Sequence, residues 1–520
     1  MVRNENGGMG MNLLFPNGEA EVKELSADAY KHLAINEIIE QIAVTEEDQQ
    51  IVSKVFKKLP SDVETTIFRQ EILSDFLENE QLCTELESII GKLNVLKEFT
   101  LHSRYGVQKK SSIWDLINYM EEMEIYTQII DDLNTAFANN KVKSKGLLHI
   151  AGLLKEIIDE DRIEELKEII KGLRTDMSTL KSVNLGVNLT PDLYPEEVIV
   201  LGYGIAPFSS KLKKTAWGLS ITQGARVTYK EPSQFMKYIG DDVEKYLAKS
   251  IKQNKRDLME YINLKGYFLL DICEDLKYYL LMARYARKLI KENYTISMPK
   301  INEASREVHL KGVYNIRLAA KKEENIVKND FTFSDKEKLF ILTGPNRGGK
   351  TMITQAIGLN VLFAKLGLYV TADEYSGYLF DAVFTHFPAD ENETLDYGRL
   401  GEEAVRVQQI VKNASAKTLV LLNETYSSTS AADGIYMATD LIHVLKHKSV
   451  PMIFNTHLHE LAYKIDEMNQ WDGSSDVVSI TMEIVDNVNT FRVLRKIPEK
   501  NSYAKNVALK YGVTYEQMIE

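Results

Sequence analysis

The sequence predicts a mixed fold: an all-α helical bundle with a small β-containing insertion, followed by an α/β domain that contains a glycine-rich loop. Three observations support this prediction. Apolar residues at three- and four-residue spacing fill most of the chain up to about residue 296, strand and helix patterns alternate after it, and the apolar strand "KLFILTG" runs directly into "PNRGGKT". The first pattern is typical of amphipathic helices, and the second of a mostly parallel sheet covered by helices.

Composition limits the classes of protein to consider. The 520 residues have room for two to four domains at roughly 150 residues each. The net charge of −12 excludes a uniformly basic nucleic-acid binder, so any contact with nucleic acid needs a local basic surface. Two cysteines far apart in the sequence, Cys83 and Cys273, favour a reducing cytoplasm. No run approaches the ~20 apolar residues that span a bilayer, and the first residues lack the apolar core of a signal peptide.

The first half of the chain is expected to be helical around one interruption. After an N-terminal tail (1–22), segments such as "DVETTIFRQEILSDFLEN" and "IEELKEIIKGLRTDM" predict long helices over 23–182. Residues 183–239 are rich in Gly, Pro, Thr and Val, which predicts strands and turns. Helical periodicity returns over 240–296, so the strand-like segment is an insertion that projects from the bundle.

The second half (297–520) alternates between strands and helices. The apolar strand candidates are "EVHLKGVYNIRL", "KLFILTG", "LFDAVFTHF", "TLVLLNE" and "VPMIFNTH", and a helix is expected from Thr351 to Leu366.

The strongest motif is the glycine-rich loop between a strand and that helix. Its sequence fits G-x-x-x-x-G-K-[ST], in which backbone N–H groups and the helix N-terminus cradle phosphates. Lys350 can reach the β- and γ-phosphates, and the Thr351 hydroxyl can ligate Mg²⁺. The predicted nucleotide-binding residues of the loop are Gly344, Pro345, Asn346, Arg347, Gly348, Gly349, Lys350 and Thr351.

Two further strand exits belong with this loop. "TLVLLNE" ends in Asn423 and Glu424, which places a carboxylate to orient water and an amide oxygen near the water shell of the metal. "IFNTHLHEL" ends in His457, a candidate donor to the γ-phosphate, with His459 as a surface residue. A His-x-His metal pair is the weaker alternative, because no further ligand has the expected spacing. Residues 427–434 form either a helix N-cap or a subunit-contact loop.

The motifs "TGPNRGGKT", "LVLLNETYSSTSAADG" and "NTHLHEL", in this order, resemble the ATPase domain of the MutS family. "NSYAKNVALKYGV" is similar to the closing helix of that domain, and "FRQEILSDFLENEQLCTEL" to the start of the family's lever helices. The likeness is specific over about 325–513 and fainter over 23–290. The resemblance implies an ABC-like ATPase that uses ATP and Mg²⁺ and forms a homodimer with nucleotides at the interface. It also implies that Ile326 packs on adenine with Asn329 nearby.

In this family the lever helices end in a clamp around duplex DNA, and the resemblance gives that role to 183–239. Basic and aromatic residues alternate in its second half, and the implied DNA contacts are Lys211, Lys213, Lys214, Arg226 and Lys230. A solvated basic surface is the alternative. The chain departs from the family in three places: no mismatch-recognition or connector domain precedes the bundle, Asn423 replaces the usual Asp, and "DYGRLGEEAVRV" (396–407) replaces the segment that contacts the partner's γ-phosphate.

Two functions from different classes therefore compete. The first is a dimeric, ATP-hydrolysing clamp on DNA that acts in repair or recombination without reading mismatches, with slow turnover because of Asn423. The second is a nucleotide-gated scaffold that binds a protein partner, or structured RNA, in place of DNA.

Overall fold

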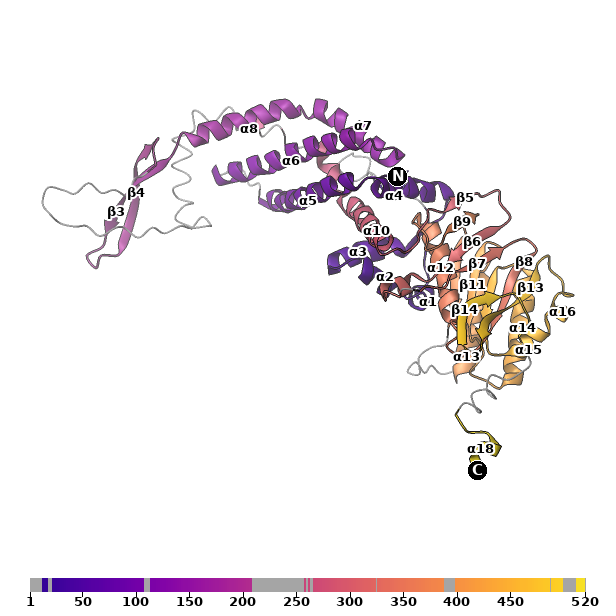
Figure 1. The fold of residues 1–520 in the computed structure, drawn as a ribbon. Coiled ribbons are helices and arrows are strands. Elements are labelled where there is room, and N and C mark those ends of the chain that lie inside the picture. Colours follow the sequence, from indigo (N-terminus) through magenta and orange to yellow (C-terminus); the bar gives the residue numbers. More distant parts are fainter. Residues whose placement is uncertain are drawn as a thin grey trace.

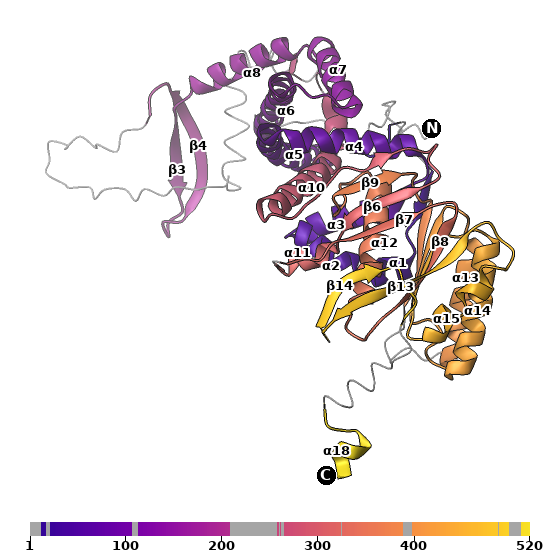
Figure 2. The same ribbon diagram turned by 45° about the vertical axis from the view of Figure 1, so that its right-hand side comes forward.

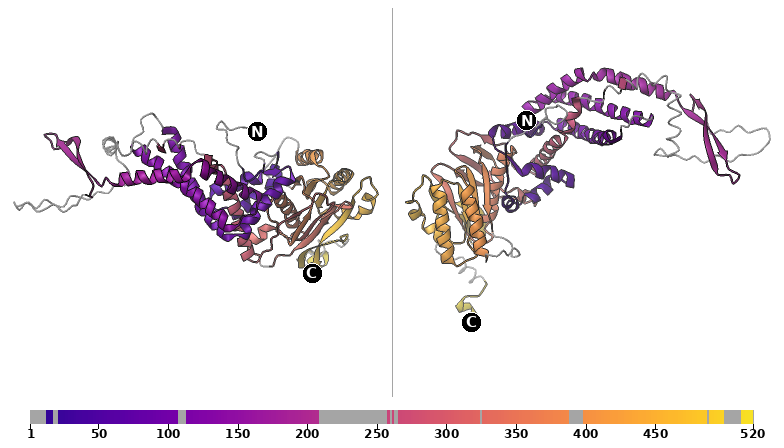
Figure 3. Two further views of the ribbon diagram at one scale, coloured as in Figure 1. Left: turned by 90° about the horizontal axis from the view of Figure 1, so that it is seen from above. Right: turned by 180° about the vertical axis from the view of Figure 1, so that it is seen from behind.

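The computed structural model describes residues 12–16, 21–106, 113–207, 257–258, 261, 265–323, 325–387, 398–486, 488–498 and 511–519. A sheet-containing domain stands at one end, and an arm of helices leads away from it to a two-stranded hairpin at the far end (Figure 1). The views from above and from behind show the same arrangement, with the domain at one end of the arm and the hairpin at the other (Figure 3). The predicted mixed fold, with a helical part before an α/β part, is confirmed in outline.

Helices dominate the N-terminal part. They are α1 (Ala27–His32), α2 (Ile35–Ile42), α3 (Glu46–Phe56), α4 (Val63–Glu78), α5 (Glu80–Gly106), α6 (Ile113–Asn140), α7 (Lys145–Glu160) and α8 (Ile163–Ser178). Side-chain caps explain several starts, since Ser26, Thr45 and Asp62 each accept a hydrogen bond from the backbone three residues on. Two short antiparallel strands, β1 (Val22–Glu24) and β2 (Lys58–Pro60), also lie here, which helical periodicity did not predict.

The predicted insertion begins as an antiparallel hairpin. Strands β3 (Ser182–Leu189) and β4 (Pro195–Gly204) pair with each other at the end of the arm (Figure 1). The proposed DNA-contacting residues Lys211, Lys213, Lys214, Arg226 and Lys230 lie outside the described residues. In the predicted return segment (240–296), the described helices are the 3₁₀ helix η2 (Lys265–Leu270) and α10 (Cys273–Lys291). Helix α10 packs on α4 and α5.

The C-terminal part is built on a six-stranded sheet in the order β10-β11-β12-β8-β13-β14. All neighbouring pairs are parallel except β13 with β14. The strands are β8 (Glu337–Thr343), β10 (Ala382–His386), β11 (Thr418–Asn423), β12 (Met452–Asn455), β13 (Asp476–Val485) and β14 (Val488–Leu494). Four of the predicted apolar strands are therefore confirmed as β8, β10, β11 and β12.

Helices cover both faces of this sheet (Figure 2). On one face lies α12 (Lys350–Leu366), which is almost wholly buried because it also packs on α4 and β2 of the helical part. The other face carries α13 (Gly398–Asn413), α14 (Ala431–His447), α15 (His459–Tyr463) and α16 (Ile465–Met468). A short helix, α18 (Tyr515–Ile519), lies near the C-terminus. The alternation predicted for the second half thus becomes a layered α/β domain.

A second, four-stranded sheet adjoins the first in the order β5-β9-β6-β7. Its strands are β5 (Lys300–Ile301), β6 (Val308–Val313), β7 (Asn329–Phe333) and β9 (Glu374–Gly377). The segment "EVHLKGVYNIRL" is only half a strand, because the side chain of Asn315 caps a new helix, α11 (Ile316–Ala320). This cap turns the chain toward the glycine-rich loop.

The N-terminal residues are tied to the helical part by buried polar contacts. The Leu13 N–H donates to the Asp275 carboxylate at 2.9 Å, and the Tyr279 hydroxyl donates to the Leu13 carbonyl at 2.9 Å. The Nε of Arg69, a side chain that is 1% exposed, donates to the Leu14 carbonyl at 2.9 Å. Among the described helices, none combines the length and the apolar character that a bilayer crossing needs.

Candidate nucleotide site

The glycine-rich loop has a backbone that only glycine adopts easily at two positions. Gly344 has φ +141°, and a Cβ there would lie 2.9 Å from the Met482 Cβ. Gly349 has φ +92°, and a Cβ there would lie 3.0 Å from the ring of Phe491. The turn closes with a hydrogen bond from the Gly348 N–H to the Pro345 carbonyl at 3.1 Å. This path brings the first N–H groups of α12 to the mouth of a cavity, which is the arrangement that binds anions.

Lys350 is the first residue of α12 and is 5% exposed. Its Nζ donates to the carbonyls of Gly344 and Pro345, at 2.9 and 3.1 Å. An ammonium has three hydrogens, so these bonds leave one donor for a phosphate oxygen. Burial lowers the pKa of Lys350, whereas the nearby Glu424 carboxylate opposes that shift. A bound anion would likewise favour the charged form.

The end of β11 meets the start of α12. The Thr351 hydroxyl donates to the Asn423 amide oxygen at 3.2 Å, and Asn423 is 7% exposed. A hydroxyl and an amide oxygen are hard oxygen donors of the kind that Mg²⁺ accepts alongside water. The two residues predicted to serve the metal are therefore adjacent, and their chemistry fits that ion.

Glu424 and His457 are in hydrogen-bonding contact at the exits of two neighbouring strands. The Nε2 of His457 lies 2.7 Å from the Glu424 Oε1. The hydrogen bond from His457, with a smaller contribution from Lys350, holds the pKa of Glu424 below its usual value although burial opposes this. Glu424 has φ 52°, an unusual backbone that recurs at functional sites, and its N–H donates to the Asn455 carbonyl at 2.7 Å. The carboxylate is therefore ionised and held in place at neutral pH.

A cavity of about 440 Å³ opens beside the loop. It is lined by the loop residues, by Glu424, and by apolar groups that include Ile326, Leu318 and Phe491. The predicted adenine residue Ile326 thus lies in the same cavity as the phosphate loop. A volume of this size lies in the range of small-molecule sites.

Asn329 lines the same cavity as Ile326, and its side chain also braces a neighbouring strand. Its Nδ2 donates to the Phe491 carbonyl at 3.1 Å, and its Oδ1 accepts from the Val493 N–H at 2.7 Å. Both hydrogen bonds fix β14 against β7, at the point where Phe491 adopts φ 59°. Asn329 therefore holds the strand that presents the Phe491 ring to the cavity.

Sequence reasoning missed Phe491 and Asn315 as cavity residues. Phe491 lies in "TFRVL", an ordinary edge-strand pattern far from the loop in sequence, and carries no motif. Asn315 had a detectable signal, because Asn before a short apolar run is a typical N-cap. The structure brings both to the loop through sheet packing, which the linear pattern did not contain.

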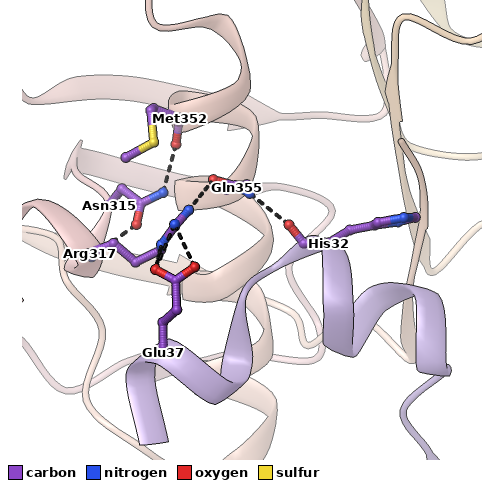
Figure 4. Close-up of polar contacts among 6 residues, drawn as sticks. All are labelled: His32, Glu37, Asn315, Arg317, Met352 and Gln355. Carbon is purple, nitrogen blue, oxygen red and sulfur yellow. Dashed lines mark hydrogen bonds and ion pairs between the residues drawn. The ribbon is translucent and has the colours of Figure 1, made fainter. Parts of the chain in front are cut away.

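The rear of the cavity is joined to the N-terminal helices (Figure 4). Asn315, which lines the cavity, donates to the Met352 carbonyl at 3.0 Å. Two residues further on, Arg317 makes a bidentate ion pair with Glu37 of α2, at 2.7 to 2.9 Å. Gln355 of α12 accepts from Arg317 and donates to the His32 carbonyl at 2.7 Å. The cavity residue Asn315 is thus linked to the helical part through Arg317, to whose N–H it is hydrogen-bonded.

Ser430 caps α14 by accepting from the Asp433 N–H at 3.2 Å, which confirms the N-cap alternative for 427–434 without testing the subunit-contact one. His459 is half-buried at the start of α15, and burial lowers its pKa. Residues 388–397 lie outside the described residues, and in α13 the Glu403 carboxylate accepts from the Ser428 hydroxyl at 2.8 Å.

Comparison with known proteins gives two family matches. Residues 340–519 match the model for MutS domain V, and residues 61–194 match the model for the MutS2 N-terminal domain.

Curated relatives agree with these matches. The chain is 33% identical over 195 residues to the DNA mismatch repair protein MutS of Chlorobium chlorochromatii, an alignment that covers 37% of this chain and 22% of the relative. It is 27% identical over 294 residues to MutS of Fusobacterium nucleatum, covering 54% and 32%. It is 29% identical over 243 residues to the DNA mismatch repair protein MSH3 of Debaryomyces hansenii, covering 45% and 23%. In these alignments the chain spans between about a fifth and a third of the length of its relatives.

Proposed function

Because the chain belongs to the MutS family, we propose that it binds ATP with Mg²⁺ and hydrolyses it slowly, and that the nucleotide gates the helical arm as a clamp on DNA in repair or recombination. One observation carries the hydrolytic part of the proposal. Lys350, Thr351 and Glu424 line one cavity, which also has apolar side chains in its wall. Thr351 contacts Asn423, and Glu424 contacts His457. The phosphates of a nucleotide need polar and charged partners, and its base needs apolar side chains to pack on.

In the proposed complex each residue has a defined role. The phosphates lie on the N–H groups of 344–351, where Lys350 supplies its remaining donor. Thr351 and Asn423 would hold Mg²⁺, which neutralises phosphate charge when bound. The base lies between Ile326 and Phe491, which both line the cavity.

Glu424 is the proposed base that orients the attacking water, since its depressed pKa keeps it ionised and able to accept a hydrogen bond. His457 holds this carboxylate, and its proposed role with nucleotide bound is to donate to a γ-phosphate oxygen. Asn423 lacks the negative charge that the family has at this position, and so the reaction is proposed to be slow.

The proposed organisation follows the family: a core and lever bundle (23–182), a clamp (183–239), a returning lever (240–296) and the ATPase domain (297–520). In that scheme two copies form a cytoplasmic homodimer with nucleotides at their interface. The long arm ending in a hairpin supports the clamp proposal (Figure 1). The contacts from Arg317 and Gln355 to the first helices offer a route from the nucleotide to the arm.

One observation favours the second candidate, a nucleotide-gated scaffold for a protein partner. Within the described hairpin segment 181–207, Lys181 is the one basic residue against three acidic ones, Asp192, Glu196 and Glu197. Large apolar side chains are also exposed there, including Tyr194, which is 71% exposed. Phosphate contact requires basic surface, so this part of the hairpin suits protein better than DNA.

The test is phosphate release by wild type, Glu424→Gln and a control, Glu467→Gln, an exposed carboxylate on α16. Removal of a catalytic base costs roughly 100-fold or more in rate. We expect this loss in Glu424→Gln with ATP binding retained, and wild-type rates in the control. Normal turnover in Glu424→Gln would remove this residue from the base role.

The same assay with linear, branched and mismatched duplexes separates the two candidates. A DNA clamp predicts that duplex DNA changes turnover or nucleotide affinity at moderate salt. If neither changes, the clamp proposal fails and the scaffold remains.

A further inference from the structure

Asn455, the last residue of β12, lies directly behind the proposed metal site. In the parallel register it stands beside Asn423, the last residue of β11. Leu421 and Ile453, two residues earlier in each strand, pack in the core on the α12 side of the sheet. Because side chains alternate along a strand, Asn423 and Asn455 point to that same side, toward the start of α12.

Asn455 holds both functional residues of β11. Its side chain is 0% exposed, and its Nδ2 donates to the Asn423 Oδ1. Its main-chain carbonyl accepts from the Glu424 N–H at 2.7 Å. Among the described residues its own Oδ1 has no hydrogen-bond partner although it is buried. A buried acceptor without a partner is costly and rare in proteins, so its presence here calls for a compensating role.

The chemistry of the amide suggests that role. The two oxygens of a carboxylate are equivalent, whereas an amide has an acceptor end and a donor end of nearly the same shape. An Asn at the strand end serves a cation only if its oxygen, and not its NH₂ group, faces the metal shell. The Asn455 NH₂ group behind Asn423 favours the orientation with the oxygen toward Thr351, since turning the Asn423 amide over would set two NH₂ groups against each other.

We propose that Asn455 is a positioning residue that fixes the Asn423 amide with its oxygen toward Thr351 and the Mg²⁺ shell, and so replaces the symmetry of the missing carboxylate. This inference rests on the proposed nucleotide function. It explains why asparagines stand at the ends of two neighbouring strands: Asn455 orients Asn423.

The experiment is a double-mutant cycle of Asn455→Ala and Asn423→Asp, with Asn455→Leu as a second variant that keeps the side-chain volume. The readout is equilibrium binding of a non-hydrolysable fluorescent ATP analogue, measured without Mg²⁺ and across a Mg²⁺ titration. Turnover does not enter this measurement.

With Asn423 present, we expect either substitution of Asn455 to raise the Mg²⁺ concentration for half-maximal effect about 10-fold, the order expected for losing one buried hydrogen bond. Affinity for the analogue without Mg²⁺ should stay the same. In the Asn423→Asp background, the same substitutions should change the Mg²⁺ requirement by less than about 2-fold, because either carboxylate oxygen serves equally.

Equal losses in both backgrounds would mean that Asn455 acts only through packing, and would overturn the proposal. So would an unchanged Mg²⁺ requirement in both Asn455 variants. Weaker binding without Mg²⁺ would likewise assign Asn455 a structural role. If the wild type itself binds no nucleotide, the proposed function fails and this inference fails with it, a result distinct from any difference between variants.

Discussion

Phe491 offers a direct test of how the cavity divides between base and phosphates. The ring lines the cavity and lies against Gly349 of the loop, and it is held there by a backbone at φ 59° that Asn329 pins on both sides. A bulky residue at positive φ costs about 1–2 kcal/mol, so the chain accepts strain to present this ring. We expect Phe491→Ala to weaken ATP binding.

The size of the effect follows from the exposure of the ring. Base–aromatic stacking is worth about 1–3 kcal/mol, and Phe491 is 47% exposed, which leaves one face for a base. A loss of about 1.4 kcal/mol corresponds to a tenfold rise in Kd. Phe491→Trp should keep the affinity.

The control is tripolyphosphate, which has no base. Its ability to compete for the loop should be the same in wild type and Phe491→Ala. Phe491→Gly should lose ATP affinity as Phe491→Ala does, but unfold at a higher temperature than it, because glycine relieves the positive φ. If Phe491→Ala binds ATP normally, or if tripolyphosphate weakens in parallel with ATP, the base does not lie on this ring.

Two predictions concern stability. Burial raises the pKa of Asp275 from its ordinary 3.8 to about 6, so the stability it contributes is present below pH ~4 and is lost as pH rises through ~6, a change of up to about 3 kcal/mol. Asp275→Asn keeps an acceptor for the Leu13 N–H. The Tm of this variant minus that of wild type should increase by several degrees between pH 4 and pH 8. A Tm difference that does not change with pH would contradict this assignment. Gly367→Ala, at φ +78° with a Cβ 2.7 Å from the Arg69 Cβ, should cost roughly 2–4 kcal/mol in thermal or urea unfolding. Its control, Gly152→Ala, has nothing within 4 Å and should be neutral or stabilising by about 1 kcal/mol; equal Tm values for the two would refute the steric argument.

Local sequence was sufficient to predict a structural element wherever the residues that determine it lie close together in the chain. The loop and its flanking strand and helix were predictable because glycine spacing, an apolar run and helical periodicity lie within about thirty consecutive residues, and β8 and α12 begin and end within one residue of the expected bounds. The hairpin at β3 and β4 was predictable in kind for the same reason. The strands β1 and β2 were missed because a three-residue strand is too short to show an alternating pattern of apolar and polar residues. They are defined only by their pairing with each other across the intervening helices.

The rest of the site depends on register between distant segments. Phe491 reaches the loop because β14 adds to β13, which pairs with β8, and nothing in "TFRVL" encodes that order. Asn329 was expected near the base and does line the cavity, but its two hydrogen bonds to β14 could not be predicted from the sequence. A residue type in a motif indicates a chemistry, whereas the fold decides to which atom that chemistry is applied.

Asn423 shows this difference most clearly. Taken alone in the sequence, Asn in place of Asp is a lost charge and predicts a weaker metal site. In the fold it stands between two donors, Thr351 and Asn455, so its oxygen has a defined direction that an isolated asparagine lacks. Two effects on Mg²⁺ binding therefore act in opposite directions. The missing charge weakens the electrostatic attraction for Mg²⁺. The hydrogen bonds to the Asn423 amide strengthen binding relative to a free asparagine, because they reduce its conformational entropy and disfavour the orientation with NH₂ toward the metal. Since a fixed dipole cannot supply the full attraction of a charge, a slow but specific ATPase is the outcome that these residues favour.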